Sequence, residues 1–174
     1  MIRLFQAEVD HLEKIQGQRI SMDGRAVRLS SLVRSHGTMM TQGLAVTPLL
    51  AGWDESAHRG RIFSYDGTGG QTEEHSHACV GSGALFASDV LNEGYRTGMD
   101  RDESVALAIR ALDAAISDDS PSSLSGPDLS RGLYPTVACA DSRGVTRMPT
   151  EEVAVLAKWL ADQVTAESDR EEAQ

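Results

Sequence analysis

Residues that could take part in acyl-transfer chemistry lie in two short stretches of this chain. The first is a Gly-Ser-Gly motif centred on Ser82, which stands between an apolar segment and an amphipathic helical pattern. The second is the polar segment 117–132, which contains Asp118, Asp119, Ser120, Ser122 and Ser123. A carboxylate and hydroxyls held rigidly can orient a nucleophile and the group that carries its proton. The alternative for the second stretch is an ordinary helix end running into a polar loop.

The Gly-Ser-Gly motif fits none of the common glycine-rich site motifs. A dinucleotide fingerprint requires a third glycine where Phe86 stands, and a P-loop requires Gly-Lys followed by Ser or Thr. The nucleophile elbow of serine hydrolases has its glycines two residues either side of the serine, whereas here they adjoin Ser82. Taken alone, the pattern favours a tight structural turn.

Two histidines and two cysteines are the remaining candidates for metal or redox chemistry. His75 and His77 are two apart on an expected strand, so they could share one face and bind a metal. No third and fourth ligand stands at metal-site spacing, which favours surface histidines, and we expect neither metal nor cofactor. Cys79 and Cys139 lie in apolar segments, which favours buried thiols in a reducing compartment over a disulfide.

Composition excludes several classes of function. A chain of 174 residues, 40% of them hydrophobic, can form one domain with a sizeable core. The formal net charge of −10 repels phosphate backbones, so we expect no nucleic-acid partner. No apolar run approaches the roughly 20 residues of a membrane span, and the N-terminal segment does not resemble a secretory signal. These observations predict a cytoplasmic protein that binds no membrane.

The hydrophobic periodicity changes several times along the chain. It predicts helices over 1–16, 22–42, 84–98, 100–116 and 150–164, and strands over 44–54, 60–67, 70–80, 133–141 and 144–149. Asp100 and Glu103 form the pattern of a capping box, and Thr150 is the expected cap of the last helix. Hairpin-linked strands with paired helices predict an α+β fold, in which helices are layered on antiparallel sheets. We expect an acidic flexible tail over 166–174.

Five stretches together carry a family resemblance: "MTQGLAVTPLLAGWD", "GRIFSYDGTGG", "VGSGALFA", "RDESVALAIRALDAA" and "SGPDLSRGLYPTV". They resemble the β subunits of the actinobacterial proteasome core particle, over a single domain from residue 1 to about 165. The resemblance implies the fold of N-terminal-nucleophile hydrolases, an α/β/β/α sandwich of two antiparallel sheets between helix layers. It also implies a homo-heptameric β ring, α-subunit partners, a regulatory ATPase, unfolded proteins as substrates and no cofactor.

The resemblance also assigns roles to individual residues. Its members cut peptide bonds with an N-terminal threonine, exposed by autocleavage and assisted by an aspartate and a lysine from the first strands. Ser82, Asp119 and Ser122 match the supporting positions that hydrogen-bond around the threonine amine and a water molecule. Ser123 is the alternative to Ser122, because the loop is about two residues longer than the family pattern. Asp66 matches a position that lines the substrate cleft of a neighbouring subunit.

The nucleophile itself has no match in these residues. The first strands of the family precede the helix with which the 174 residues begin. The only Gly-Thr junctions, 37–38 and 67–68, fall in a helical pattern and a hairpin turn, and the only lysines, Lys14 and Lys158, fall in helical patterns. We therefore expect a domain incomplete at its N-terminus, with a supporting shell that is inactive alone. The alternative is a noncatalytic structural or assembly subunit of a proteasome-like ring.

Overall fold

The computed structural model describes residues 1–36, 47–118 and 132–160. The chain divides into two compact units, which are treated separately below. The first unit contains Met1–Val80 and Ala140–Val145, and the second contains Gly81–Cys139 and Thr146–Gln174. The prediction of one domain over 1–165 stays a prediction, and the expected acidic tail lies outside the described residues.

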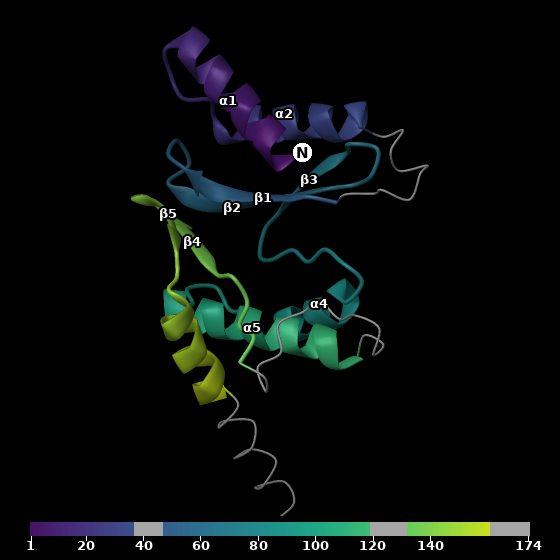
Figure 1. Ribbon diagram of the computed structural model, residues 1–174, viewed down its shortest axis with the longest axis vertical. Helices are drawn as coiled ribbons and strands as arrows, with labels where there is room; N and C mark the ends of the chain where they lie inside the picture. The colour runs from purple at the N-terminus through teal and green to yellow at the C-terminus, as the bar shows by residue number, and fades with distance from the viewer. Residues whose placement is uncertain (37–46, 119–131, 161–174) are drawn as a thin grey trace, which may run out of the picture. The chain divides into compact units, whose positions relative to one another are not determined.

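The first unit consists of two helices and a three-stranded antiparallel sheet (Figure 1). Neighbouring strands follow each other along the chain, and Leu50 pairs with Phe63 while Ile62 pairs with Glu74. The elements are α1 (Ile2–Gln16), α2 (Met22–Ser35), β1 (Leu49–Asp54), β2 (Arg59–Tyr65) and β3 (Gln71–Glu74).

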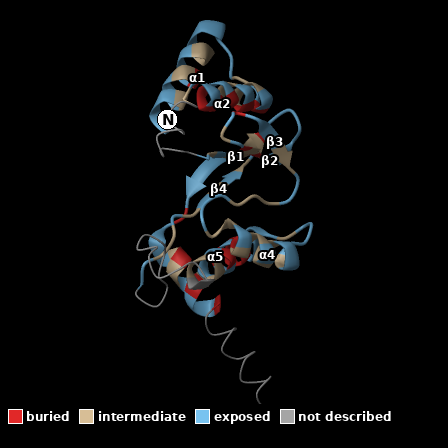
Figure 2. Ribbon diagram, turned by 90° about the vertical axis from the view of Figure 1, so that its right-hand side faces the viewer, coloured by how far each residue is buried: buried red, intermediate tan, exposed pale blue. Residues whose placement is uncertain are grey.

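Helix α2 packs on one face of this sheet because side chains alternate along β2. Phe63 and Tyr65 point to the same face, and each is only 3% exposed. They join the buried residues of α2, shown in red in Figure 2: Met22, Ala26, Leu29, Leu32 and Val33. The hydroxyl of Tyr65 donates a hydrogen bond of 3.1 Å to the carbonyl oxygen of Ala26. This bond satisfies the one polar atom of an otherwise apolar contact.

The second unit contains α4 (Ala84–Gly94) and α5 (Arg101–Asp118), which pack against each other. The predicted capping box is confirmed, since the amide of Glu103 donates to Asp100 Oδ1 at 2.9 Å and the amide of Asp100 donates to Glu103 Oε2 at 3.0 Å. A further helix covers residues 150–160. The core of this unit consists of Val105, Ala106, Ile109, Met148, Val153, Ala157 and Leu160.

A short hairpin, β4 (Ala138–Asp141) and β5 (Gly144–Arg147), forms a second, two-stranded sheet. Its turn at Ser142 and Arg143 is where the sequence predicts it. Cys139 in β4 and Cys79 are both free thiols and half-buried. Helices together with antiparallel hairpins confirm the predicted α+β class.

Several element ends differ from the sequence predictions. Helix α2 ends at Ser35 rather than 42, and α4 ends at Gly94 rather than near 98. Among the strands, β1 begins at Leu49 rather than 44, β3 ends at Glu74 rather than 80, β4 begins at Ala138 rather than 133, and β5 ends at Arg147 rather than 149. Thr150 is the first residue of the last helix rather than its cap, because the carbonyl of Pro149 already accepts the amide of Val153 at 3.2 Å. Apolar periodicity leaves such boundaries open by a few residues, because it does not report the hydrogen bonds that end an element. No helix within the described ranges is both long and apolar enough to cross a bilayer.

Candidate functional site

Ser82 occupies the exposed turn that leads directly into α4. Gly81 has a φ of 118°, a conformation that favours glycine, and its carbonyl accepts the amide of Ala84 at 3.2 Å. Gly83 is the N-cap of the helix, and its carbonyl accepts the amide of Ala87 at 3.1 Å. The two glycines therefore build a tight turn that presents the hydroxyl-bearing residue at the start of a helix.

The same turn is seated on α5. A Cβ atom placed on Gly83 would lie 2.7 Å from both the Cβ and the carbonyl oxygen of Ala115, so only glycine fits this close approach. Ala115 stands four residues before Asp119, whose predicted site partners Ser122 and Ser123 follow. All three of these lie outside the described residues. Their grouping with Ser82 stays a prediction, and the contact between the turn and α5 supports it.

Asp66 builds the turn between β2 and β3. Its Oδ1 accepts hydrogen bonds from the Thr68 amide at 2.8 Å, the Thr68 hydroxyl at 2.7 Å and the Gly70 amide at 2.8 Å. These bonds, that from the Thr68 hydroxyl first, lower the pKa of the exposed Asp66 carboxyl. The side chain is thereby held as an ionised group in a fixed position. Its role in a substrate cleft stays a prediction.

Of the two Gly-Thr junctions, the structure describes only the one at 67–68. Thr68 lies within the turn just described, and both its amide and its hydroxyl are bound to Asp66. Its carbonyl accepts a bond of 3.4 Å from Nε of Arg34 on α2. Thr68 is thus a structural residue of a hairpin turn, as the sequence predicts. Thr38 lies outside the described residues.

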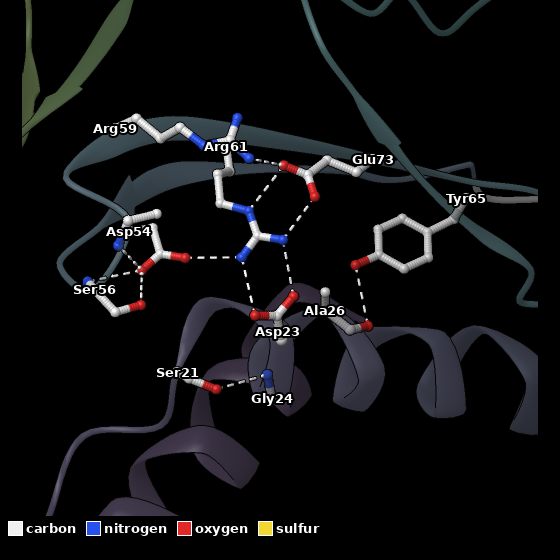
Figure 3. A network of polar contacts seen from close by, with 11 residues as sticks. Ser21, Asp23, Gly24, Ala26, Asp54, Ser56, Arg59, Arg61, Tyr65 and Glu73 are labelled. Atoms are coloured by element: carbon white, nitrogen blue, oxygen red, sulfur yellow. Dashed lines mark hydrogen bonds and ion pairs between the residues drawn. The ribbon is translucent and has the colours of Figure 1, made fainter.

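Arg61 lies on the central strand of the three-stranded sheet and donates hydrogen bonds to three carboxylates (Figure 3). The Arg61 guanidinium pairs with Asp54 of β1 at 2.8 Å, Asp23 of α2 at 2.8 Å and Glu73 of β3 at 2.7 Å. It also lies 4.8 Å from the ring centroid of Phe63. The Arg61 side chain is 10% exposed and that of Asp54 only 5%. One cation therefore joins three strands and a helix.

Sequence reasoning missed this cluster, although a signal for it exists. Arg61, Phe63 and Tyr65 alternate along β2, so they share the buried face. An arginine on a buried face must be paired, and Asp54 and Glu73 on the two neighbouring strands are suitable partners.

Comparison with known proteins identifies the family. Residues 1–126 match the family described as "Proteasome subunit". The chain belongs to the proteasome subunit family. It is 40% identical over 169 residues to a protein named "Proteasome subunit beta" from Streptomyces griseus, covering 97% of this chain and 59% of the relative. It is 39% identical over 163 residues to a protein of the same name from Jonesia denitrificans, covering 94% of this chain and 53% of the relative.

These findings confirm the resemblance to bacterial proteasome β subunits and, with it, the predicted fold of N-terminal-nucleophile hydrolases. The chain spans between a half and three-fifths of the length of these two relatives. Within the described parts of this proteasome subunit, no group of three His, Cys, Asp or Glu side chains could hold a metal ion. His75 and His77 both follow the end of β3.

We expect Gly83→Ala to destabilise the second unit of this proteasome subunit by about 2 kcal/mol, the usual scale of overpacking. The added methyl group must move the Ser82 turn away from Ala115. Urea unfolding followed by the fluorescence of Trp159, in a Trp53→Phe background, measures the effect. Because the carbonyl of Ala115 is also close, the Ala115→Gly change should restore the lost stability only in part. Unchanged stability of Gly83→Ala would contradict the close packing of the turn.

Charges around Arg61 shift the acidity of its partners. The pKa of Glu73 falls to about 2, chiefly because its carboxylate accepts hydrogen bonds from Arg61. The pKa of Asp54 is lowered strongly, first by the hydroxyl of Ser56 and then by Arg61, and that of Asp23 is lowered by Arg61. The pKa values of all three carboxyls are thus lowered, most strongly for Asp54 and Glu73.

This arrangement gives acid sensitivity a definite sign. A carboxyl with a lowered pKa in the folded state adds stability that is complete above its unfolded pKa and is lost as the pH falls toward the folded one. For Glu73 the stability should therefore be constant above about pH 5 and decline from its ordinary value of 4.5 toward 2. Thermal melts at stepped pH measure this decline. An Arg61→Met variant should show a shallower slope, and an equal slope would rule out Arg61 as its source.

Proposed function

We propose that this chain belongs to the proteolytic β ring of a bacterial proteasome, whose activity is threonine-type endopeptidase cleavage of unfolded proteins delivered by an ATPase. The observation that carries the proposal is the family match, together with the Ser82 turn seated at Ala115 of α5. That helix leads directly to Asp119. In this proposal Ser82, Asp119 and Ser122 form the supporting shell around the nucleophile, with Ser123 as the alternative loop hydroxyl.

In this proposal the 174 residues supply the supporting groups, and the nucleophile lies outside them. A threonine hydroxyl attacks a peptide carbonyl only when a nearby base takes its proton. Thr68 is committed to its turn, and Lys14 lies on α1 while Lys158 lies in the helix over 150–160. We therefore expect the polypeptide of these 174 residues to hydrolyse no peptide by itself, because in this proposal the shell residues support a nucleophile and do not act as one. The attacking threonine comes from residues outside them.

Assembly and location follow from the same proposal. The partners are other β subunits in a heptameric ring and the proteasome α subunits, and the ring lies in the cytoplasm. Asp66 contributes its fixed, ionised carboxylate to the substrate cleft of a neighbouring subunit. The formal net charge of −10 disfavours nucleic acid as a partner.

A chimaera tests the catalytic proposal. The part of the Streptomyces griseus relative that this chain does not match is joined to the 174 residues, co-expressed with α subunits, and assayed with fluorogenic peptides. We expect turnover by the chimaera and none by the 174-residue chain alone. Ser82→Ala and Asp119→Asn in the chimaera should each lower kcat, while Ser76→Ala in the segment after β3 serves as a control. Robust turnover by the purified 174-residue chain would contradict the proposal.

The second candidate is a noncatalytic assembly subunit, favoured by the missing match to the nucleophile. It requires that the 174-residue chain assemble into rings with α subunits. A sizing column would detect such rings by their size. A chimaera that assembles but hydrolyses no peptide would support this alternative. Peptide turnover that depends on Ser82 and Asp119 would exclude it.

A further inference from the structure

A buried serine of α2 is bonded to the turn that carries Asp66. Ser30 is 8% exposed, and its hydroxyl donates a hydrogen bond of 2.5 Å to the carbonyl oxygen of Gly69, which is 39 positions away and also buried. A hydroxyl removed from water needs such a partner, because an unpaired polar group loses its hydration without compensation. The bond is shielded from solvent, and it connects two separate elements.

This contact belongs to one stripe along α2. Ala26, Ser30 and Arg34 are four residues apart, so they lie one above another on the same side of the helix. The carbonyl of Ala26 accepts the hydroxyl of Tyr65 at the end of β2 (Figure 3), and Nε of Arg34 donates to the Thr68 carbonyl at 3.4 Å. Arg34 is exposed, whereas Ser30 in the middle of the stripe is buried. Ser30 therefore provides the buried side-chain donor to this turn.

The peptide group between Gly69 and Gly70 joins Ser30 to Asp66. Its carbonyl accepts the hydroxyl of Ser30, and its N–H donates to Asp66 Oδ1 at 2.8 Å. The peptide is trans, so its C=O and N–H lie in one plane and point in opposite directions. One flat group thus turns its acceptor toward the helix and its donor toward the carboxylate.

Glycine on both sides leaves this peptide group free to rotate unless something binds it, because neither residue has a Cβ atom. Rotation of the plane would turn the Gly70 N–H away from the Asp66 carboxylate. The hydroxyl of Ser30 opposes that rotation from the other side of the plane. Its donation to the carbonyl also polarises the peptide group, which strengthens the N–H as a donor.

We propose that Ser30 is a positioning residue for Asp66, which acts through the Gly69–Gly70 peptide group to fix the carboxylate that contacts substrate in the cleft of a neighbouring subunit. The inference rests on the proposed function for the role of Asp66 in that cleft. A carboxylate that is already fixed binds substrate more tightly than a mobile one, because less side-chain freedom is lost on binding. Ser30 thereby contributes to substrate affinity from beneath the turn.

The pKa of the Asp66 carboxyl reports the link directly. It is lowered first by the Thr68 hydroxyl and then by the Gly70 amide. Ser30→Ala acts on the second of these bonds, so we expect the pKa of Asp66 to rise part of the way toward its ordinary value of 3.8. An NMR titration of the carboxyl signals in the 174-residue chain measures this rise. Asp66→Asn identifies the signal by removing it.

Ser31→Ala is the matched control for this change. The Ser31 hydroxyl is exposed and donates to the Val27 carbonyl of its own helix at 3.1 Å, so its loss leaves the bonds of the turn in place. We expect the pKa of Asp66 to be the same in Ser31→Ala as in the parent. Arg34, the cation bonded to the turn, is kept in both variants, so its charge cannot explain a difference between them.

Hydrogen exchange gives a second measurement that does not depend on a variant. Gly70 is exposed, yet its amide should exchange at least about tenfold more slowly in the parent chain than in an unfolded one, since it is bound to Asp66. In Ser30→Ala this protection should fall. Circular dichroism verifies that each variant is folded.

The functional readout uses the chimaera described above, assembled with α subunits. Because Asp66 acts in binding and not in the chemical step, Ser30→Ala should raise KM about fivefold and leave kcat within about twofold of the parent. Asp66→Asn should raise KM at least as much. Ser30→Ala added to Asp66→Asn should change KM no further, since the group that Ser30 positions is then gone. A purely structural role would leave the KM of the assembled, folded enzyme unchanged.

Three outcomes would overturn the inference: an unchanged Asp66 pKa in folded Ser30→Ala, free exchange of the Gly70 amide in the parent chain, or KM effects of Ser30→Ala and Asp66→Asn that simply add. Failure of the proposed function gives a different pattern. An inactive chimaera, or a KM that Asp66→Asn does not change, together with a raised pKa in Ser30→Ala, would keep the link and reject the role in the cleft. An active chimaera with an unchanged pKa would reject the link and keep the proposed activity.

Discussion

Arg61→Met should unfold about 10 °C below the parent protein, because the buried carboxylate of Asp54 and the half-buried carboxylate of Glu73 lose the cation that they share. Asp54 is 5% exposed, and Glu73 accepts two bonds from Arg61, from Nε at 2.9 Å and from Nη2 at 2.7 Å. Methionine keeps the apolar stem over Phe63 but cannot neutralise these charges. Differential scanning fluorimetry at pH 7 measures the midpoint, with Trp53 reporting on the first unit.

Arg59→Met is the matched control for this change. Arg59 stands two residues earlier on the same strand, is 51% exposed and forms an ion pair of 2.8 Å with Glu73. An exposed pair of this kind contributes little, so the midpoint should move by less than about 3 °C. Equal effects of the two changes would show that burial around Arg61 does not decide the outcome.

Gly69→Ala should lower the free energy of unfolding by about 3 kcal/mol, from two separate causes. Gly69 has a φ of 82°, which disfavours residues with a Cβ atom. The added Cβ would also lie 2.7 Å from the Ser30 carbonyl oxygen and 3.0 Å from Arg34 Cβ on α2. The turn built by Asp66 would have to leave the helix. Urea unfolding followed by Trp53, in a Trp159→Phe background, measures the loss.

Gly60→Ala provides the comparison within the same sheet. Gly60 lies on β2, and nothing stands within 4 Å of a Cβ placed on it. We expect a change of less than about 1 kcal/mol there, of either sign. If Gly69→Ala lowered the free energy of unfolding as little as Gly60→Ala, the β2–β3 turn would not be packed closely against α2. Asp66 would then be held only by the hydrogen bonds within its own turn.

Local sequence patterns predicted the elements that hold the candidate site. The alternation over 60–67 and the period of 100–116 correspond to β2 and α5, because side chains that share a face repeat at two residues in strands and near 3.6 in helices. The capping box of Asp100 and Glu103 was equally readable, since its bonds span only three residues. The family resemblance, now confirmed, assigned the role of Ser82, which its own turn does not reveal.

Interactions between distant residues could not be read in this way. Arg61 and Asp23 are 38 positions apart, and no local period connects them. The need for glycine at position 83 is likewise set by Ala115, on another helix. Such requirements arise only when separate elements are packed to near-crystalline density.

The amino-acid sequence alone determined the order of helices and strands, the family and the identities of the candidate supporting residues, since these depend on near neighbours and on motifs. The tertiary structure decided which charges are buried together and which glycines are irreplaceable. The physical reason is that burial and hydrogen-bond pairing are properties of the space between elements, and the chain fills that space only when it folds.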